Sequence, residues 1–252
     1  MIKRLGIRNT SLVYPEFITD GLKFSYDTFS TSSYPGSGTT FYDISGQNNH
    51  MTLFMQVLPA GSSSNSNIGW EATGIKRFYF NYSPYSSGGN SYGRVPLSTT
   101  DSLGYTFGGW VQNVAGAGSY TFQKGMDGVY GGWSLSLGVG NNGISLGSIN
   151  TSSKYVGVSG NITLTDNQWY YVVGQYIHNT SLKIFVNGVL VNSVNQGVNQ
   201  ISLRNSPGWT ISAPSTALRG RSVVSTYHMY NRILDETEIL QNFNSNKTRY
   251  GY

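Results

Sequence analysis

The chain of 252 residues contains no cysteine. Disulfide bonds and thiolate metal ligands are therefore excluded, and the fold has to be stabilised by burial of apolar side chains and by strand pairing. Charged residues are also scarce, at 11% of the sequence. No apolar run is long enough to cross a bilayer, and none of signal-peptide length follows the basic residues near Met1. The sequence therefore predicts a soluble protein made without a secretory signal.

Acidic residues number only eleven, and the arrangement that glycoside hydrolysis needs is missing. Hydrolysis requires two carboxylates that share a face, as at alternate positions of one strand, and no predicted strand carries them. The one acidic cluster, residues 235–238, stands at a predicted helix start, where capping and the helix dipole explain it. His50, His178 and His228 lie outside any triad pattern. We therefore predict no catalytic residues and no enzymatic activity.

Glycine and tyrosine, in contrast, are abundant, with 32 Gly and 19 Tyr. Turn-forming and aromatic residues in these proportions are typical of many short strands rather than of amphipathic helices. Residues 105–110 alternate with a period of two, which predicts a half-buried strand. Residues 133–139 alternate in the same way, and Asn142-Gly143 leads into a further apolar run, which indicates a hairpin. The sequence thus predicts an all-β fold.

The clearest local signal is a hairpin at Asn187-Gly188. These two residues separate the apolar runs 182–186 and 189–191. Both positions of a type I′ turn need a positive φ, which Asn and Gly tolerate best. The run 169–173 is almost continuously apolar, which indicates a strand at the centre of a sheet that is covered on both faces.

One short helix is predicted near the C-terminus. Asp235 can cap its start, and Glu238 can reciprocate three residues later. Ile239 and Phe243 lie one turn apart on a single face. We therefore expect this face of the helix to pack against the strands.

The first residues form a basic segment that contains Lys3, Arg4 and Arg8. Such a segment is either an edge strand or frayed terminus, or an arm that docks the protein onto a larger assembly. We predict an N-terminal basic arm over residues 1–20 and a single domain over residues 21–252.

Three segments are rich in turn formers. Segments 61–69 and 83–93 contain many Ser, Asn and Gly residues between strand-like runs, which predicts long surface loops rather than domain boundaries. Segment 34–50 is dense in turn formers and precedes the apolar pair Leu53 and Phe54. We interpret it as a loop of defined shape rather than a flexible linker.

Three stretches, 34–46, 169–193 and 229–239, carry a resemblance to a known family. In order, they contain a Tyr-Pro-Gly opening, a Trp with an Asn-Gly hairpin, and a Tyr-Asn-Arg-x-Leu turn before a closing helix. Together they resemble the concanavalin A-like lectin/glucanase superfamily, in the laminin G-like branch found in structural proteins of tailed bacteriophages. The resemblance implies a jelly-roll sandwich of two antiparallel sheets. Residues 209–213 depart from the family pattern, which leaves the register of that segment open.

Domains of this family often bind calcium, which they hold with Asp, Asn and backbone oxygens in loops. Asp127 and Asn187 are conceivable ligands. The sequence has no dense Asp/Asn loop, so we assign neither a metal site nor a cofactor.

Glycan binding by this fold combines an aromatic platform with amide or carboxylate hydrogen bonds. Tyr85, Tyr92 and Tyr130 lie in Gly/Ser-rich segments and are the candidate glycan-binding residues. The alternative is that the aromatic residues fill the sandwich. The tryptophans on predicted strands are expected in the core: Trp110, Trp133 and Trp169.

The formal net charge is +5 and the isoelectric point is near 9.3, which favours an acidic partner. The basic residues are scattered, however, and no nucleic-acid motif is present. We therefore expect neither a nucleic acid nor a membrane as a partner.

Two functional hypotheses remain. The leading one is a non-enzymatic structural protein of a bacteriophage virion, as capsid decoration or another surface component. Its partners are then other virion proteins, either the capsid or the same chain in a symmetric oligomer, and its location is the virion. The alternative is a carbohydrate-binding module for host recognition on a tail fibre, with host surface glycans as partners.

Overall fold

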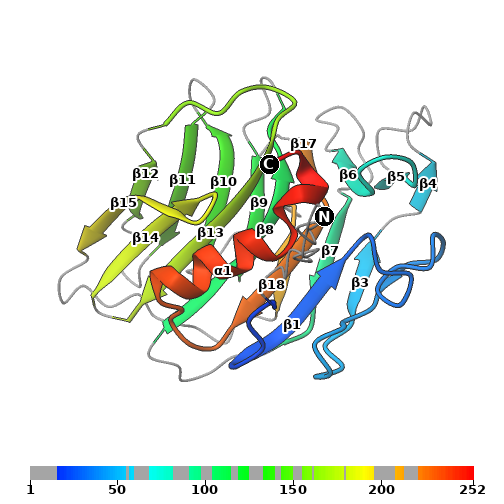
Figure 1. Ribbon diagram of the computed structural model, residues 1–252, viewed down its shortest axis with the longest axis horizontal. Coiled ribbons are helices and arrows are strands. Elements are labelled where there is room, and N and C mark those ends of the chain that lie inside the picture. The colour runs from blue at the N-terminus through cyan, green and yellow to red at the C-terminus, as the bar shows by residue number, and fades with distance from the viewer. Residues whose placement is uncertain are drawn as a thin grey trace, which may run out of the picture.

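The computed structural model describes residues 16–54, 57–59, 68–81, 91–97, 104–114, 119–124, 133–139, 143–149, 155–160, 162–178, 180–195, 208–212 and 221–252. They form two sheets packed face to face, with one helix on the outer face of one sheet (Figure 1). This confirms the all-β sandwich with a short C-terminal helix. No described helix has the length and apolar character needed to cross a membrane.

Ten described strands form the sheet that carries the helix: β1 (Leu22–Asp27), β4 (Val57–Pro59), β5 (Ile68–Glu71), β6 (Arg77–Asn81), β8 (Gly104–Gln112), β13 (Trp169–Ile177), β14 (Ser181–Val186), β15 (Val189–Asn195), β17 (Arg221–Val224) and β18 (Thr226–Tyr230). Their order is β15-β14-β13-β8-β17-β6-β5-β4, while β18 pairs with both β8 and β1. The pairs are antiparallel except β4 with β5, which is parallel. The long strands β8 and β13 lie at the centre, as the apolar run 169–173 predicted.

Eight described strands form the second sheet: β2 (Thr40–Phe41), β3 (Met51–Phe54), β7 (Tyr92–Val95), β9 (Ser119–Lys124), β10 (Trp133–Val139), β11 (Gly143–Ile149), β12 (Tyr155–Gly160) and β16 (Trp209–Ile211). Their order is β12-β11-β10-β9-β16-β7-β3-β2. Strand β16 lies between β7 and β9 and is antiparallel to both, with Trp209 opposite Val95 and Lys124. This pairing resolves the register that the sequence left open.

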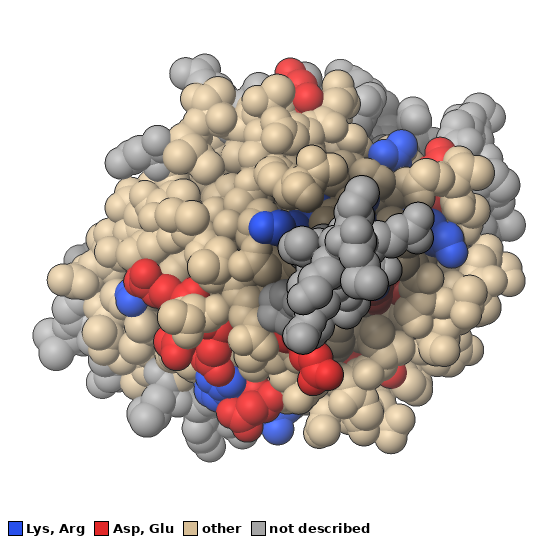
Figure 2. Space-filling model, viewed as in Figure 1, with Lys and Arg blue, Asp and Glu red and all other residues tan. Residues whose placement is uncertain are grey.

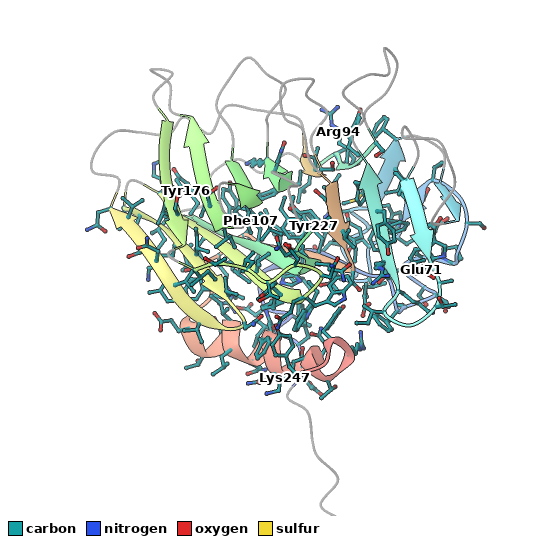
Figure 3. The ribbon with its side chains drawn as sticks, turned by 90° about the horizontal axis from the view of Figure 1, so that it is seen from above. Glu71, Arg94, Phe107, Tyr176, Tyr227 and Lys247 are labelled. Carbon is teal, nitrogen blue, oxygen red and sulfur yellow. The ribbon has the colours of Figure 1, made fainter. Side chains whose placement is uncertain are left out.

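The main core lies between the two sheets. Phe107 and Tyr227 point into this layer, between Lys247 on one side and Arg94 on the other (Figure 3). Phe122 stacks on Tyr227 with ring centroids 4.3 Å apart. Aromatic pairs of this kind stabilise the fold beyond the free energy gained by burying their area. Many of the aromatic residues therefore stabilise the core between the sheets.

A second core lies under the helix, on the outer face of the ten-stranded sheet. Helix α1 (Glu236–Asn246) and the 3-10 helix η1 (Lys247–Tyr250) cover Trp110, whose ring stacks on Tyr250 at 4.0 Å. Strand β8 is therefore buried on both faces, and the prediction that it is half-buried was wrong, because alternation cannot show that a helix covers the second face. Trp110 and Trp169 are buried as predicted, whereas the side chain of Trp133 is outside the described residues.

Both predicted hairpins are present. Asn187 has φ 52° and Gly188 has φ 83°, the two positive values that a type I′ turn between β14 and β15 requires. Strands β10 and β11 pair antiparallel, with Leu135 opposite Leu146. The turn residue Asn142 is outside the described residues.

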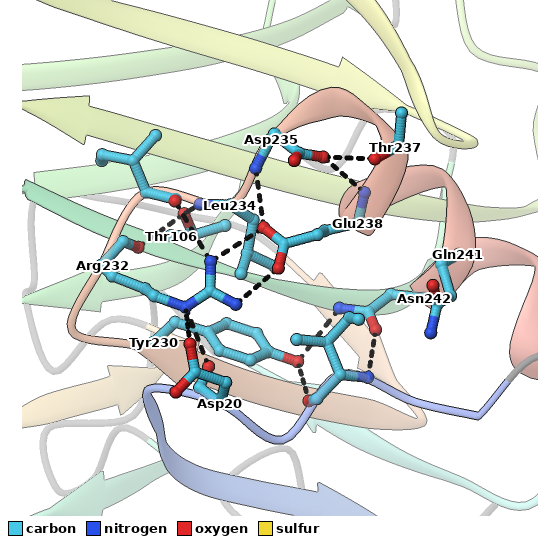
Figure 4. A network of polar contacts seen from close by, with 12 residues as sticks. Asp20, Thr106, Tyr230, Arg232, Leu234, Asp235, Thr237, Glu238, Gln241 and Asn242 are labelled. Carbon is cyan, nitrogen blue, oxygen red and sulfur yellow. Dashed lines mark hydrogen bonds and ion pairs between the residues drawn. The ribbon is translucent and has the colours of Figure 1, made fainter.

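The helix start is a capping box, as predicted. The Asp235 carboxylate accepts from the Glu238 N–H at 2.9 Å, and the Glu238 carboxylate accepts from the Asp235 N–H at 2.9 Å. Ile239 and Phe243 are buried against the strands. Arg232 adds a bidentate ion pair to Glu238, which the sequence analysis did not predict (Figure 4).

The turn-rich segment 34–50 has a defined shape because a carboxylate holds it together. Asp43 is 8% exposed and accepts hydrogen bonds from the backbone N–H groups of Ser25, Ser45 and Asn49 and from the Ser45 hydroxyl. A buried carboxylate with four donors is fully satisfied, so it anchors the loop to β1.

The N-terminal segment contacts the helix from Glu16 onward. The Gln241 amide donates to the Glu16 carbonyl at 2.7 Å, and the Asn242 Oδ1 accepts from the Ile18 N–H at 2.8 Å. The Tyr230 hydroxyl donates to the Ile18 carbonyl at 2.8 Å (Figure 4). The last part of the predicted arm thus packs on the sandwich, and residues 1–15 are outside the described residues.

The predicted loops 61–69 and 83–93 are shorter than expected at their C-terminal ends. Ile68 and Gly69 already belong to β5, and Tyr92 and Gly93 belong to β7. Residues 61–67 and 83–90 are outside the described residues.

Candidate functional site

The outer face of the eight-stranded sheet carries an exposed aromatic pair. In β3, Met51 and Leu53 point into the core, so Thr52 and Phe54 point outward. Phe54 is 37% exposed and lies opposite Tyr92 on β7. The two rings stack with centroids 4.5 Å apart and an interplanar angle of 14°.

Tyr92 is therefore the one predicted glycan-binding residue that the structure describes. It lies on strand β7 and not in a loop, which corrects the expectation from the Gly/Ser-rich sequence around it. The strand forms because β3 and β16 pair with β7 on either side. Tyr85 and Tyr130 are outside the described residues, so their role stays a prediction.

A row of polar side chains crosses the same face next to the aromatic pair. Thr52, Arg94, Thr210 and Gln123 lie opposite one another on β3, β7, β16 and β9. Arg94 projects from the side of the sandwich opposite η1 (Figure 3). Thr210 is 8% exposed and Gln123 is fully buried.

Gln123 is unusual because both atoms of its side-chain amide lack a hydrogen-bond partner among the described residues. A buried amide without partners costs about 1–3 kcal/mol, so such groups are rare in folded proteins. Because Gln123 is fully buried, its amide is not accessible to a ligand in this structure, and the exposed part of this face is the aromatic pair. An exposed aromatic pair is the type of surface on which sugar rings stack.

Sequence reasoning named Tyr92 but missed its partner Phe54 and the amide of Gln123. The alternation of Met51 to Phe54 was a usable signal, because a period of two places Phe54 on the solvent side. No sequence signal could pair Phe54 with Tyr92, because the two residues come from strands that are distant in the chain.

The three histidines have structural partners. His228 is 3% exposed and its Nε2 lies 2.7 Å from the Tyr171 hydroxyl, while burial lowers the pKa of His228 to about 3. The His50 Nδ1 accepts from the Asp43 N–H, and the His178 Nδ1 lies 2.7 Å from the Tyr176 hydroxyl. Within the described part of the chain, none of these contacts is a nucleophile–base pair of a triad.

The acidic cluster at the helix start is structural. Figure 2 shows acidic side chains gathered on the face that carries α1. Arg232 lies between two of them, with its Nε 2.9 Å from the Asp20 carboxylate and its Nη2 2.6 Å from Glu238. The hydrogen bonds from Arg232 lower the pKa of the Glu238 carboxyl below its ordinary value. These contacts fasten the helix to the chain segments on either side of it.

The two conceivable calcium ligands do not meet in a described site. The Asn187 Oδ1 accepts from the Tyr171 N–H at 3.0 Å, and its amide nitrogen donates to the Tyr252 hydroxyl at 3.1 Å. The Asn187 side chain is thus used to hold the turn. Asp127 is outside the described residues, and the described part of the chain contains no group of three acidic or histidine residues able to hold a metal.

One further charged group is buried at the end of strand β9. Lys124 is 3% exposed, and its ammonium lies 4.7 Å from the centroid of the Tyr105 ring and 5.6 Å from that of Trp209. Burial lowers the pKa of Lys124 to about 8. The contact with two ring faces is a cation–π arrangement that partly offsets the loss of hydration.

The two-sheet sandwich with an exposed aromatic surface defines a lectin-like β-domain. The family described as the Concanavalin A-like lectin/glucanases superfamily matches residues 87–240. The chain belongs to this superfamily. No curated protein sequence matches the chain significantly.

Several solved structures are similar in fold. The binding domain of Paraclostridial Mosquitocidal Protein 1 is 17% identical with a TM-score of 0.62, over 90% of this chain and 52% of that chain. The binding domain of Botulinum Neurotoxin DC, in complex with SialylT, is 14% identical with a TM-score of 0.66, over 90% and 52% of the two chains. Botulinum neurotoxin type C is 16% identical with a TM-score of 0.63, over the same shares. The chain spans about half the length of these structures, and the likeness is one of fold.

Proposed function

We propose that the chain is a non-enzymatic, glycan-binding surface module. The observation that carries this proposal is the stacked pair Phe54 and Tyr92 on the outer face of the eight-stranded sheet. Exposed aromatic rings lose water when a sugar ring stacks on them, and this gain is available without any catalytic group.

A further observation supports glycan binding. Among structures of similar fold, one is a complex with SialylT, and another concerns a neurotoxin whose cell entry depends upon interaction with two ganglioside molecules.

A glycan array probed with the full chain tests the proposal. We expect binding to a defined set of glycans with dissociation constants near ~1 mM for single sites, which corresponds to about 4 kcal/mol. The variants Tyr92→Ala and Phe54→Ala are expected to lose it. Tyr42→Ala is the matched control, because Tyr42 is an exposed tyrosine, 41% accessible, that lies outside strands β3 and β7. Binding that is absent from the array, or unchanged in both variants, refutes the proposal.

We further propose that the module is displayed on a bacteriophage virion, as capsid decoration or another surface component. The supporting observation is segment 34–46, which resembles phage laminin G-like proteins and folds into a loop held by Asp43. A tail-fibre position is the alternative, in which glycan binding serves host recognition.

Mass spectrometry and electron microscopy of purified virions test this second proposal. We expect the protein to be present in the particles and its density to lie at many symmetric positions on the shell. Density at a tail tip in few copies supports the tail-fibre alternative. Absence of the protein from purified particles refutes both virion positions but leaves the glycan-binding proposal intact.

A further inference from the structure

A cleft of about 430 Å³ lies on the outer face of the ten-stranded sheet, on the opposite side of the sandwich from Phe54 and Tyr92. Its floor is formed by outward-facing residues of β1 and β18, where Ser25 lies opposite His228. One wall is the end of α1, at Asn246, and the other is the loop at Ile44. The volume is in the range of about 300–1,000 Å³ that is typical of small-molecule sites.

The cleft exists because the helix ends before the sheet does. Under α1 the outward positions of the sheet carry large side chains such as Trp110 and Tyr171, which fill the second core. Beyond Asn246 the outward positions of β1 and β18 include the small polar residues Ser25 and Thr226. A well-packed interior leaves few voids, so an open, polar-floored hollow between a helix end and a loop is a specific feature of this face.

The hydrogen-bonding capacity of the cleft is partly unused. The Asn246 Oδ1 accepts from the Trp110 Nε1–H at 2.6 Å, which fixes the orientation of the amide. The Thr226 Oγ1 accepts from the Trp110 N–H at 2.9 Å. Three groups donate to no acceptor among the described residues: the Asn246 amide N–H groups, the Thr226 hydroxyl and the Ser25 hydroxyl. Oriented donors that line a hollow are suited to the oxygens of a ligand.

One ring nitrogen of His228 is already used in the protein. The His228 Nε2 lies 2.7 Å from the Tyr171 hydroxyl, and burial keeps the ring neutral by lowering its pKa to about 3. The neutral ring lines the cleft, so its Nδ1 is the nitrogen left for a hydrogen bond to a ligand.

The charges in the cleft are largely balanced. The Arg249 Nη1 lies 2.6 Å from the Asp27 Oδ2, so the guanidinium and the carboxylate neutralise each other. Glu16 is the remaining charged residue in the lining. A site without excess positive charge does not favour an anion, and its oriented donors match hydroxyl oxygens instead.

Apolar surfaces complete the site. Phe17 lines the mouth and packs edge-on against the His228 ring, with centroids 4.9 Å apart, and Ile44 is 43% exposed on the opposite wall. A hexose has the matching character, because its C–H groups contact apolar surfaces while its hydroxyls accept and donate hydrogen bonds. We propose that this cleft is a second saccharide site, which takes a neutral hexose unit through Asn246, Thr226 and His228. The proposal does not depend on the aromatic pair of the other face.

Titration of the full chain with glucose, galactose, mannose and N-acetylglucosamine, followed by amide NMR shifts, tests this site. We expect at least one sugar to shift the amides of Ser25, Thr226 and Asn246 with a dissociation constant near ~1 mM. Tyr92→Ala is expected to keep these shifts, so failure of the aromatic pair and failure of the cleft give different results. Shifts from none of the four sugars, or from an acidic sugar or a peptide alone, overturn the proposal.

Two variants address the cleft itself. Ser25→Phe fills it without removing a recorded side-chain hydrogen bond, and Ser193→Phe is the matched control at an exposed position of β15. Asn246→Asp keeps the oxygen that accepts from Trp110 and removes the N–H donors. We expect Ser25→Phe and Asn246→Asp to weaken binding by about tenfold or more, a change of about 1.4 kcal/mol, and Ser193→Phe to bind normally. Wild-type affinity in a folded Asn246→Asp variant overturns the proposal.

Discussion

The two outer faces of the sandwich carry similar kinds of residue but differ in what covers them. On the ten-stranded sheet, helix α1 covers Trp110 and Tyr171, which are fully buried. On the eight-stranded sheet, Phe54 remains 37% exposed beside Tyr92. Aromatic side chains therefore stabilise the fold on one face and are available to a ligand on the other. The covering element, and not the residue type, decides the role of an aromatic strand residue in this protein.

The largest expected effect is on the covered face. Trp110→Ala removes a ring that stacks on Tyr250 at 4.0 Å and donates to Asn246, so we expect the free energy of unfolding to fall by about 4 kcal/mol. Urea unfolding followed by circular dichroism measures the change. A loss below about 1 kcal/mol means that the helix does not form a second core, and the comparison between the faces fails.

The second prediction concerns the fastening of the helix. Arg232→Met removes the bidentate contact to Glu238 and the contact to Asp20, and we expect a loss of about 1–2 kcal/mol in the free energy of unfolding. Lys183→Met is the control, since the Lys183 side chain on β14 makes no hydrogen bond or ion pair among the described residues, and a surface change is expected to stay within about 0.5 kcal/mol. Equal effects of the two variants contradict the role given to Arg232.

The third prediction is a pH dependence from the covered face. Burial lowers the pKa of His228 to about 3, while the unfolded chain titrates near ~6.5. Between these values the unfolded state binds more protons, so the free energy of unfolding rises with pH. The contribution of His228 to the free energy of unfolding is complete above pH ~6.5. It is lost as the pH falls, by about 2 kcal/mol between pH ~6.5 and ~5.

Unfolding experiments over this pH range measure the effect. His228→Gln keeps a nitrogen near the position of Nε2 and cannot take up a proton. We therefore expect the free energy of unfolding to depend less steeply on pH, by the amount that one bound proton contributes. His178→Asn, at a less buried histidine, is the control. A slope that His228→Gln leaves unchanged shows that another group causes the pH dependence.

The smallest expected effect on stability is on the open face. Tyr92→Ala removes a partly exposed ring from a stacked pair, and we expect a loss of about 1 kcal/mol or less. The same urea measurement applies, so the value can be set directly beside that of Trp110→Ala. A loss of about 3 kcal/mol or more identifies the pair as structural, and the aromatic surface then needs another explanation.

Much of the fold followed from short-range sequence signals. The turn at Asn187-Gly188 has the positive φ values that were expected, and the capping box of Asp235 and Glu238 is present. These features depend on residues a few positions apart, so a single sequence contains their cause. The position of the site did not follow, since Phe54 and Tyr92 meet only through pairing of distant strands.

The amino-acid sequence by itself determined the all-β class, the hairpins and the start of the helix, because propensity, alternation and capping act locally. Only the tertiary structure decided which sheet face the helix covers. It also decided that β8 is buried on both sides, and that the cleft with Asn246 and His228 lies where α1 ends. Alternation shows that a strand has two faces, but what packs on each face depends on contacts between residues far apart in the chain.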